Sequence, residues 1–111
     1  MLDKKITVMM PAYNEEQDLP VLLGRIQRAL EGWANYRILI VDDGSRDKTP
    51  TIADGFAAQG VLLIRQTNQG KGRAVQNGVS QATGEYILVQ DADLEYDPDD
   101  YIPMLQKLGP N

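Results

Sequence analysis

The feature that most constrains the fold of this 111-residue chain is an alternation of short apolar runs with helix-like apolar patterns. The short runs lie at residues 6–10, 37–41, 61–64 and 85–89. Runs of this length, rich in β-branched residues, favour buried strands, and apolar residues three or four positions apart favour helices. The first helical pattern consists of Leu19, Leu22, Leu23, Ile26 and Leu30. Strands that alternate with helices predict crossover units and a mostly parallel sheet.

Local signals indicate where the elements begin and end. Pro11 is expected to end the first strand, and Thr49 to cap a helix that has Pro50 in its first position. A third helix is expected to carry an apolar stripe of Ala74, Val75, Val79 and Ala82, and a fourth helix is expected at residues 97–108. With helices on both faces of the sheet, the predicted fold class is α/β, a Rossmann-like three-layer α/β/α arrangement.

The length of the chain predicts one α/β domain over residues 1–111. A sheet of four parallel strands leaves both of its edges uncovered, and an uncovered edge tends to pair with another strand. We therefore expect either that the chain is part of a longer protein or that it forms a homodimer through its exposed sheet edges.

Composition excludes several kinds of function. Sixteen acidic and 11 basic residues give a net charge of −5, which argues against a nucleic-acid partner. The absence of cysteine and histidine excludes disulfides, thiolate metal sites and histidine-based nucleophile schemes, so any metal must be a hard ion bound by oxygen. The chain shows neither a signal peptide nor the roughly 18–20 apolar residues of a membrane helix, and we expect it to be soluble.

Polar residues follow every predicted strand. The carboxyl ends of parallel strands meet at one edge of the sheet, where ligands bind in open α/β folds. The segments concerned are Pro11-Ala12-Tyr13-Asn14-Glu15, Asp42-Asp43-Gly44-Ser45, Asn68-Gln69-Gly70-Lys71-Gly72-Arg73 and Asp91-Ala92-Asp93. The sequence therefore predicts one ligand site, built by four separate segments.

Asp91 and Asp93 flank a small residue at the end of the last predicted strand and offer two hard oxygen ligands for Mg²⁺ or Mn²⁺. They could also cap the next helix or belong to a solvated face, because six of the ten residues 91–100 are acidic. Their position directly after a buried strand favours the metal site.

The other segments have two interpretations each. Asp42 and its neighbours could form a tight turn, or one carboxylate could accept hydrogen bonds from a ligand's hydroxyls or base. Lys71 opens a helix whose amino-terminal end suits a phosphate, although the local motif is neither of the common phosphate-binding loops. Tyr13 could stack on a base or cover the strand end, and Glu15 could simply favour the helix dipole.

Four motifs taken together resemble the family-two inverting glycosyltransferases, which have the GT-A fold. They are P-A-Y-N-E, V-D-D-G-S-x-D, N-x-G-K-G and Q-D-A-D-L-E-Y-D-P, in this order along the chain. Residues 90–98 with Tyr101 are most similar to polyprenyl-phosphate sugar transferases, the dolichyl-phosphate mannose synthases and their bacterial glucosyl relatives. The resemblance covers almost the whole chain and implies that it is the nucleotide-sugar-binding half of a longer catalytic domain.

The resemblance also implies a role for each matching position. Pro11, Tyr13 and Glu15 would line the nucleotide pocket, Ile40 and Asp42 would lie beside the base or ribose, and Lys71 would lie near the nucleotide. Asp91, Ala92 and Asp93 would meet the diphosphate, with the two acids binding Mg²⁺ or Mn²⁺ and acting as the catalytic pair. Asp43 and Asp47 match the motif and are expected to be structural.

The implied activity is metal-dependent, inverting transfer of a hexose from a UDP- or GDP-linked donor to a lipid phosphate, a polyprenyl phosphate. Such an enzyme would work at the cytoplasmic side of a membrane, and this chain alone would be inactive. The alternative is a nucleotide-binding α/β module without catalysis. A sugar-phosphate nucleotidyltransferase is disfavoured, because the segment after the first strand lacks the glycine-rich, basic signature of that class.

Overall fold

The computed structural model describes residues 2–32, 34–82 and 86–92. Its strands are β1 (Leu2–Ala12), β2 (Ala34–Asp42), β3 (Val61–Arg65) and β4 (Tyr86–Val89). Its helices are α1 (Leu19–Leu30), α2 (Thr49–Gly55) and α3 (Lys71–Gln81), with a short 3₁₀ helix, η1 (Ala57–Gln59). The fourth expected helix, at residues 97–108, lies outside the described residues.

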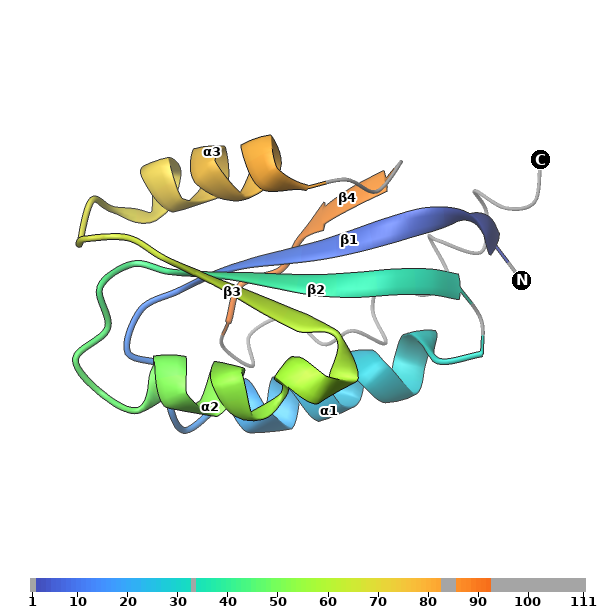
Figure 1. The fold of residues 1–111 in the computed structure, drawn as a ribbon, viewed down its shortest axis with the longest axis horizontal. Helices are drawn as coiled ribbons and strands as arrows, with labels where there is room; N and C mark the ends of the chain where they lie inside the picture. Colours follow the sequence, from blue (N-terminus) through green and yellow to red (C-terminus); the bar gives the residue numbers. More distant parts are fainter. Residues whose placement is uncertain (1, 33, 83–85, 93–111) are drawn as a thin grey trace.

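The strands form one sheet in the order β3-β2-β1-β4, and every pair is parallel. Figure 1 shows α1 and α2 on one face of the sheet and α3 on the other. The chain therefore steps outward from β1 to β3 and then returns across the sheet to place β4 on the other side of β1. The predicted three-layer α/β fold is confirmed.

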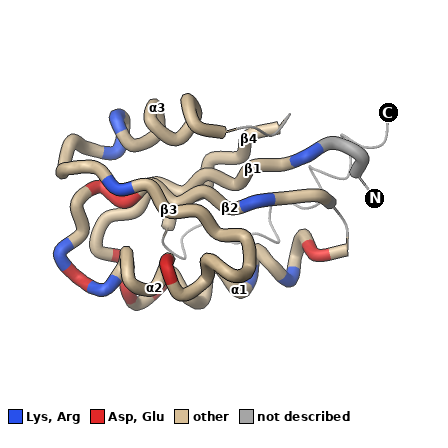
Figure 2. The backbone as a smooth tube through the Cα atoms, in the orientation of Figure 1, with Lys and Arg blue, Asp and Glu red and all other residues tan. Residues whose placement is uncertain are grey.

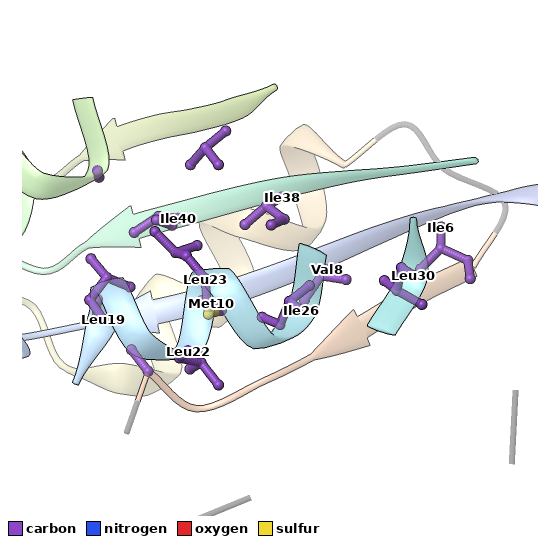
Figure 3. Close-up of a cluster of buried hydrophobic side chains, with 14 residues drawn as sticks. Ile6, Val8, Met10, Leu19, Leu22, Leu23, Ile26, Leu30, Ile38 and Ile40 are labelled. Carbon is purple, nitrogen blue, oxygen red and sulfur yellow. The ribbon is translucent and has the colours of Figure 1, made fainter. Parts of the chain in front are cut away.

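The larger core lies between α1 and the face of the sheet that this helix covers, called the α1 face (Figure 3). Ile38 and Ile40 of β2 point into it, whereas Leu39 and Val41 belong to a smaller core under α3. The two sets alternate because successive strand residues point to opposite faces. β2 is therefore buried on both faces, as its continuous apolar sequence predicts.

Helix α3 packs very closely on β1. A Cβ atom at Gly78 would lie 2.5 Å from Met9 Cγ, so only glycine fits at this contact without a shift of Met9. The buried face of α3 therefore passes through Ala74 and Gly78, one turn apart. The prediction that Val79 belongs to the buried stripe of this helix is wrong, because Val79 is 45% exposed.

β1 does not end at Pro11 as expected but continues to Ala12, with Pro11 paired to Val41 of β2. The pairing of β1 with β4 reaches only Met9. Alternate residues of β1 direct their backbone groups to the same neighbour, so the nitrogen of Pro11, two residues beyond Met9, points past the end of that ladder. Proline is tolerated here because no ladder hydrogen bond is lost.

In the part of the chain that the structure describes, β3 and β4 form the edges of the sheet. The homodimer expected from such edges stays a prediction. No helix among the described residues is long and apolar enough to cross a membrane.

Candidate functional site

A cleft of about 310 Å³ opens at the carboxyl edge of the sheet, beside the ends of β1 and β4. These are the strands at which the winding of the sheet changes direction, the usual ligand position in open α/β folds. The cleft is lined by Pro11, Ala12, Tyr13, Glu15, Asp43, Lys71, Ala74, Asp91 and Ala92. All four sequence segments expected to converge do contribute, because Tyr13 follows β1, Asp43 follows β2, Lys71 follows β3 and Asp91 follows β4.

Most of the predicted site residues lie in this cleft, but two do not. Ile40 is fully buried in the core on the α1 face. Asp42 is also fully buried; its Oδ2 accepts a hydrogen bond from the Ser45 amide at 3.1 Å and lies 3.6 Å from Arg65 Nε. Their nucleotide-binding roles stay predictions. Asp93 lies outside the described residues.

Asp43, expected to be structural, both lines the cleft and organises the loop before α3. Its Oδ1 accepts hydrogen bonds from Gln66 Nε2 and the Gln69 amide, each at 2.7 Å. Its Oδ2 accepts from the Gly70 amide at 3.0 Å and from Asn68 Nδ2 at 3.3 Å. One carboxylate thus fixes the approach to the first turn of α3.

The close approach of this loop explains the glycine that follows Asp43. Gly44 has a φ of +77°, and a Cβ atom there would lie 2.8 Å from the backbone nitrogen of Asn68. Burial alone would raise the pKa of Asp43, but the hydrogen bonds from Gln69, Gln66 and Gly70 outweigh it and lower this pKa below its ordinary value. The acid is therefore held in its charged form.

A second set of hydrogen bonds joins the loop after β1 to the loop after β2. The Asn14 amide donates to Ser45 Oγ at 2.8 Å, and the Arg46 amide donates to Asn14 Oδ1 at 2.9 Å. Asn14 takes a left-handed conformation, with φ of 53°, which asparagine tolerates better than most residues. The Glu15 amide donates to Thr49 Oγ1 at 2.8 Å. The rim that carries Tyr13 and Glu15 is therefore fastened to α2.

Asp47 completes this connection. It accepts hydrogen bonds from the Glu16 amide at 3.2 Å, from the Thr49 amide at 2.9 Å and from the Thr49 hydroxyl. Burial alone would raise the pKa of Asp47, but the hydrogen bonds, first those from Thr49, lower it. Thr49 is not the cap that the sequence predicts: it is the first residue of α2, with Pro50 after it, and its hydroxyl links Asp47 to Glu15.

The open part of the cleft carries an aromatic ring and a cation. Tyr13 is 45% exposed, so its ring is available to a flat partner such as a base. Lys71 is the first residue of α3, and its ammonium group forms an ion pair with Asp91 after β4. Figure 2 shows acidic and basic positions interleaved along the loops at this edge of the sheet.

The chemistry of Asp91 fits a hard cation. Its side chain is about one quarter exposed, and its carboxylate already holds a positive group, the ammonium of Lys71. Within the described ranges no three acidic residues are grouped so as to hold a metal ion. A site with fewer protein ligands suits Mg²⁺ or Mn²⁺, which take the rest of their shell from water and phosphate.

Sequence reasoning missed the dual position of Asp43 and the contribution of Ala74 to the cleft wall. One signal favoured Asp43 over Asp42. Asp42 continues the alternation of Ile38 and Ile40 and so belongs to the face of β2 that α1 covers, whereas Asp43 is the first residue beyond the strand.

The sequence profile of glycosyl transferase family 2 matches residues 7–111. The dolichol-phosphate mannosyltransferase of Pyrococcus furiosus is 41% identical over 103 residues, 91% of this chain and 29% of that protein. The undecaprenyl-phosphate 4-deoxy-4-formamido-L-arabinose transferase of Photorhabdus laumondii is 38% identical over 109 residues, 94% of this chain and 33% of that protein. The chain thus spans about a third of the length of these relatives.

Solved structures share the fold. A mannosyltransferase from Pyrobaculum calidifontis, in complex with GDP-Man and Mn²⁺, superposes with a TM-score of 0.83 at 26% identity, over 99% of this chain and 34% of that one. TarS residues 1–349 from S. aureus, in complex with UDP, superposes with a TM-score of 0.74 at 26% identity, over 80% of this chain and 27% of that one.

Proposed function

The chain belongs to glycosyl transferase family 2, and on that premise we propose that its cleft binds the nucleoside diphosphate part of a UDP- or GDP-hexose. The observation that carries the proposal is the convergence of Tyr13, Lys71 and Asp91 on one cleft at the carboxyl edge of the sheet. An aromatic ring, a cation and a carboxylate suit a base, a phosphate and a metal ion respectively. Residues 1–111 would then be one nucleotide-sugar-binding domain.

Each group in the cleft has a role in this proposal. Tyr13 and Glu15 would contact the nucleoside, and Lys71 with the amino-terminal turn of α3 would bind phosphate oxygens. Asp91 and Asp93 would hold Mg²⁺ or Mn²⁺, which when bound neutralises the charge that develops on the departing diphosphate. The Mn²⁺ in the complex of the Pyrobaculum calidifontis mannosyltransferase supports the use of a divalent cation.

The longer protein would transfer the hexose, with inversion, to a polyprenyl phosphate at the cytoplasmic side of a membrane. The names of the two similar transferases, which specify dolichol phosphate and undecaprenyl phosphate, support this acceptor. A phosphate acceptor is already an anion and needs no strong general base, which is compatible with a chain that has no histidine. The groups that bind the acceptor would lie in the part of the protein beyond this third.

Calorimetric titration of the chain with UDP and with GDP, each with and without Mn²⁺, tests the proposal. We expect binding of one nucleotide that needs the metal and is lost in Asp91→Asn and Asp93→Asn. Asp54→Asn is the matched control, because it removes one exposed acid from α2, outside the cleft.

Metal-independent binding that survives both substitutions would contradict the assignment of Asp91 and Asp93. Binding of the nucleotide with no sugar transfer by the longer protein would favour a binding module without catalysis. Transfer of radiolabelled hexose to a polyprenyl phosphate by the longer protein would establish the transferase.

A further inference from the structure

The ion pair between Lys71 and Asp91 joins two segments of the cleft that the chain separates by 20 positions. Lys71 starts α3 and Asp91 follows β4, and both residues line the cleft. The lysine side chain is 62% exposed and the aspartate side chain 26% exposed, so the pair is accessible to solvent and to ions.

The local structure of α3 does not account for a lysine at this position. A cation in the first turn of a helix opposes the helix dipole, and α3 has no acidic residue there to compensate. The backbone before Lys71 is held in place, because the amide of the preceding Gly70 donates a hydrogen bond to Asp43. The loop therefore fixes the backbone of Lys71 at the cleft by a contact that does not involve Asp91.

The consequence concerns any divalent cation that approaches Asp91. The carboxylate already has an ammonium partner, and an ammonium and a hard metal ion compete for the same oxygens. The lysine lies on a flexible stem and can be displaced, whereas a backbone amide cannot. A diphosphate brought in with the metal offers the displaced ammonium a second anion within the same cleft.

We propose that Lys71 is an exchangeable counter-ion of Asp91. Its ion pair lowers the affinity of the cleft for a free divalent cation, and this penalty is relieved when a nucleoside diphosphate is present. The Asp91 carboxylate would hold the cation, and the Lys71 ammonium would move to a phosphate oxygen. Metal and nucleotide then bind with positive coupling, which by linkage is the same in both directions. The inference rests on the proposed function, since it needs the nucleotide to occupy this cleft.

Mn²⁺ titrations, followed by the electron paramagnetic resonance of the free ion, test the exchange in the absence and presence of UDP or GDP at low ionic strength. Lys71→Met removes the ammonium and Lys71→Arg keeps a cation. Lys5→Met is the matched control, because it removes the same charge from an exposed position of β1, near the end of the strand opposite the cleft. Asp91→Asn removes the carboxylate.

Without nucleotide, we expect Lys71→Met to bind Mn²⁺ about fivefold more tightly than the wild type, the upper range for an exposed ion pair. Lys71→Arg and Lys5→Met should match the wild type, and Asp91→Asn should bind weakly. With nucleotide, and after the Mn²⁺ bound by the nucleotide alone is subtracted, the gain in Mn²⁺ affinity should be about fivefold smaller in Lys71→Met than in the wild type, because the diphosphate still ligates the ion directly.

Mn²⁺ binding that depends on Asp91 but is unchanged by Lys71→Met, with coupling to the nucleotide intact, would overturn the exchange and leave the proposed function standing. Equal tightening in Lys5→Met would also overturn it, because general charge would then explain the effect. Absence of Mn²⁺ binding in every variant, with and without nucleotide, would overturn both the exchange and the metal-dependent function.

Discussion

The loop after β2 and the segment after β4 bring carboxylates to the same edge of the sheet, yet their partners differ in kind. Asp43 and Asp47 accept hydrogen bonds from backbone amides of neighbouring loops. Asp91 faces the ammonium of an exposed lysine side chain. Backbone donors are fixed by the fold, whereas a lysine can move away. The first region therefore builds the cleft, and the second can exchange its partner for a ligand.

The largest expected effect follows from removal of Asp43. Asp43→Ala leaves two backbone amides and two side-chain amides without their charged acceptor, and we expect the free energy of unfolding to fall by about 2–4 kcal/mol. Urea unfolding followed by circular dichroism measures it. Asp54→Ala, at an exposed position of α2, should change the value by less than about 0.5 kcal/mol. Equal stability of the two variants would contradict the structural role of Asp43.

A smaller loss is expected when the Thr49 hydroxyl is removed. Thr49→Val keeps the shape of this buried side chain but leaves the Glu15 amide without its acceptor, and we expect a loss of about 1–2 kcal/mol. Thr49→Ser keeps the hydroxyl and should retain most of the stability. The same urea experiment measures both, and a valine variant as stable as the wild type beside a less stable serine variant would show that packing alone matters here.

Low pH should weaken the contribution of Asp43 and Asp47 to the stability of the folded chain. Because the pKa values of Asp43 and Asp47 are lowered in the folded chain, their contribution to stability is complete above the ordinary aspartate pKa and is lost as the pH falls through the lowered values. The urea concentration at the unfolding midpoint of the wild type should therefore decrease when the pH is lowered below about 4. Asp43→Asn should show a shallower fall, and an unchanged slope would contradict the lowered pKa.

The smallest effect is expected for Lys71. Its ion pair with Asp91 is exposed, so Lys71→Met should change the free energy of unfolding by no more than about 0.5 kcal/mol. A loss comparable with that of Asp43→Ala would mean that the segment after β4 depends on this pair, and the distinction between the regions would fail.

The sequence predicted the fold well because its signals are local and repeated. The apolar run of β2 and the apolar spacing of α1 each identify their element without reference to the rest of the chain. The errors arose where tertiary contacts decide. Val79 is exposed because Gly78 allows α3 to approach Met9, a contact that helical spacing alone does not show.

The candidate site was predictable at the level of segments and less so at the level of roles. The convergence of Tyr13, Lys71 and Asp91 followed from the rule that the carboxyl ends of parallel strands meet at one edge. The different positions of Asp42 and Asp43 could not be predicted from this rule. They depend on the path of the loop from residue 66 to residue 70, which supplies the hydrogen-bond donors for Asp43. Hydrogen-bond partners distant in sequence leave no local pattern to read.

The central claim is that Asp91 binds a ligand whereas Asp43 stabilises the folded chain. One measurement tests it most directly. The urea midpoint of the wild type and of Asp91→Asn is compared with and without Mn²⁺ together with UDP or GDP, because a ligand that binds the folded state raises its stability. We predict equal midpoints without ligand, and a rise on addition of ligand in the wild type alone. A lower midpoint for Asp91→Asn without ligand, or an equal rise in both proteins, would contradict the account.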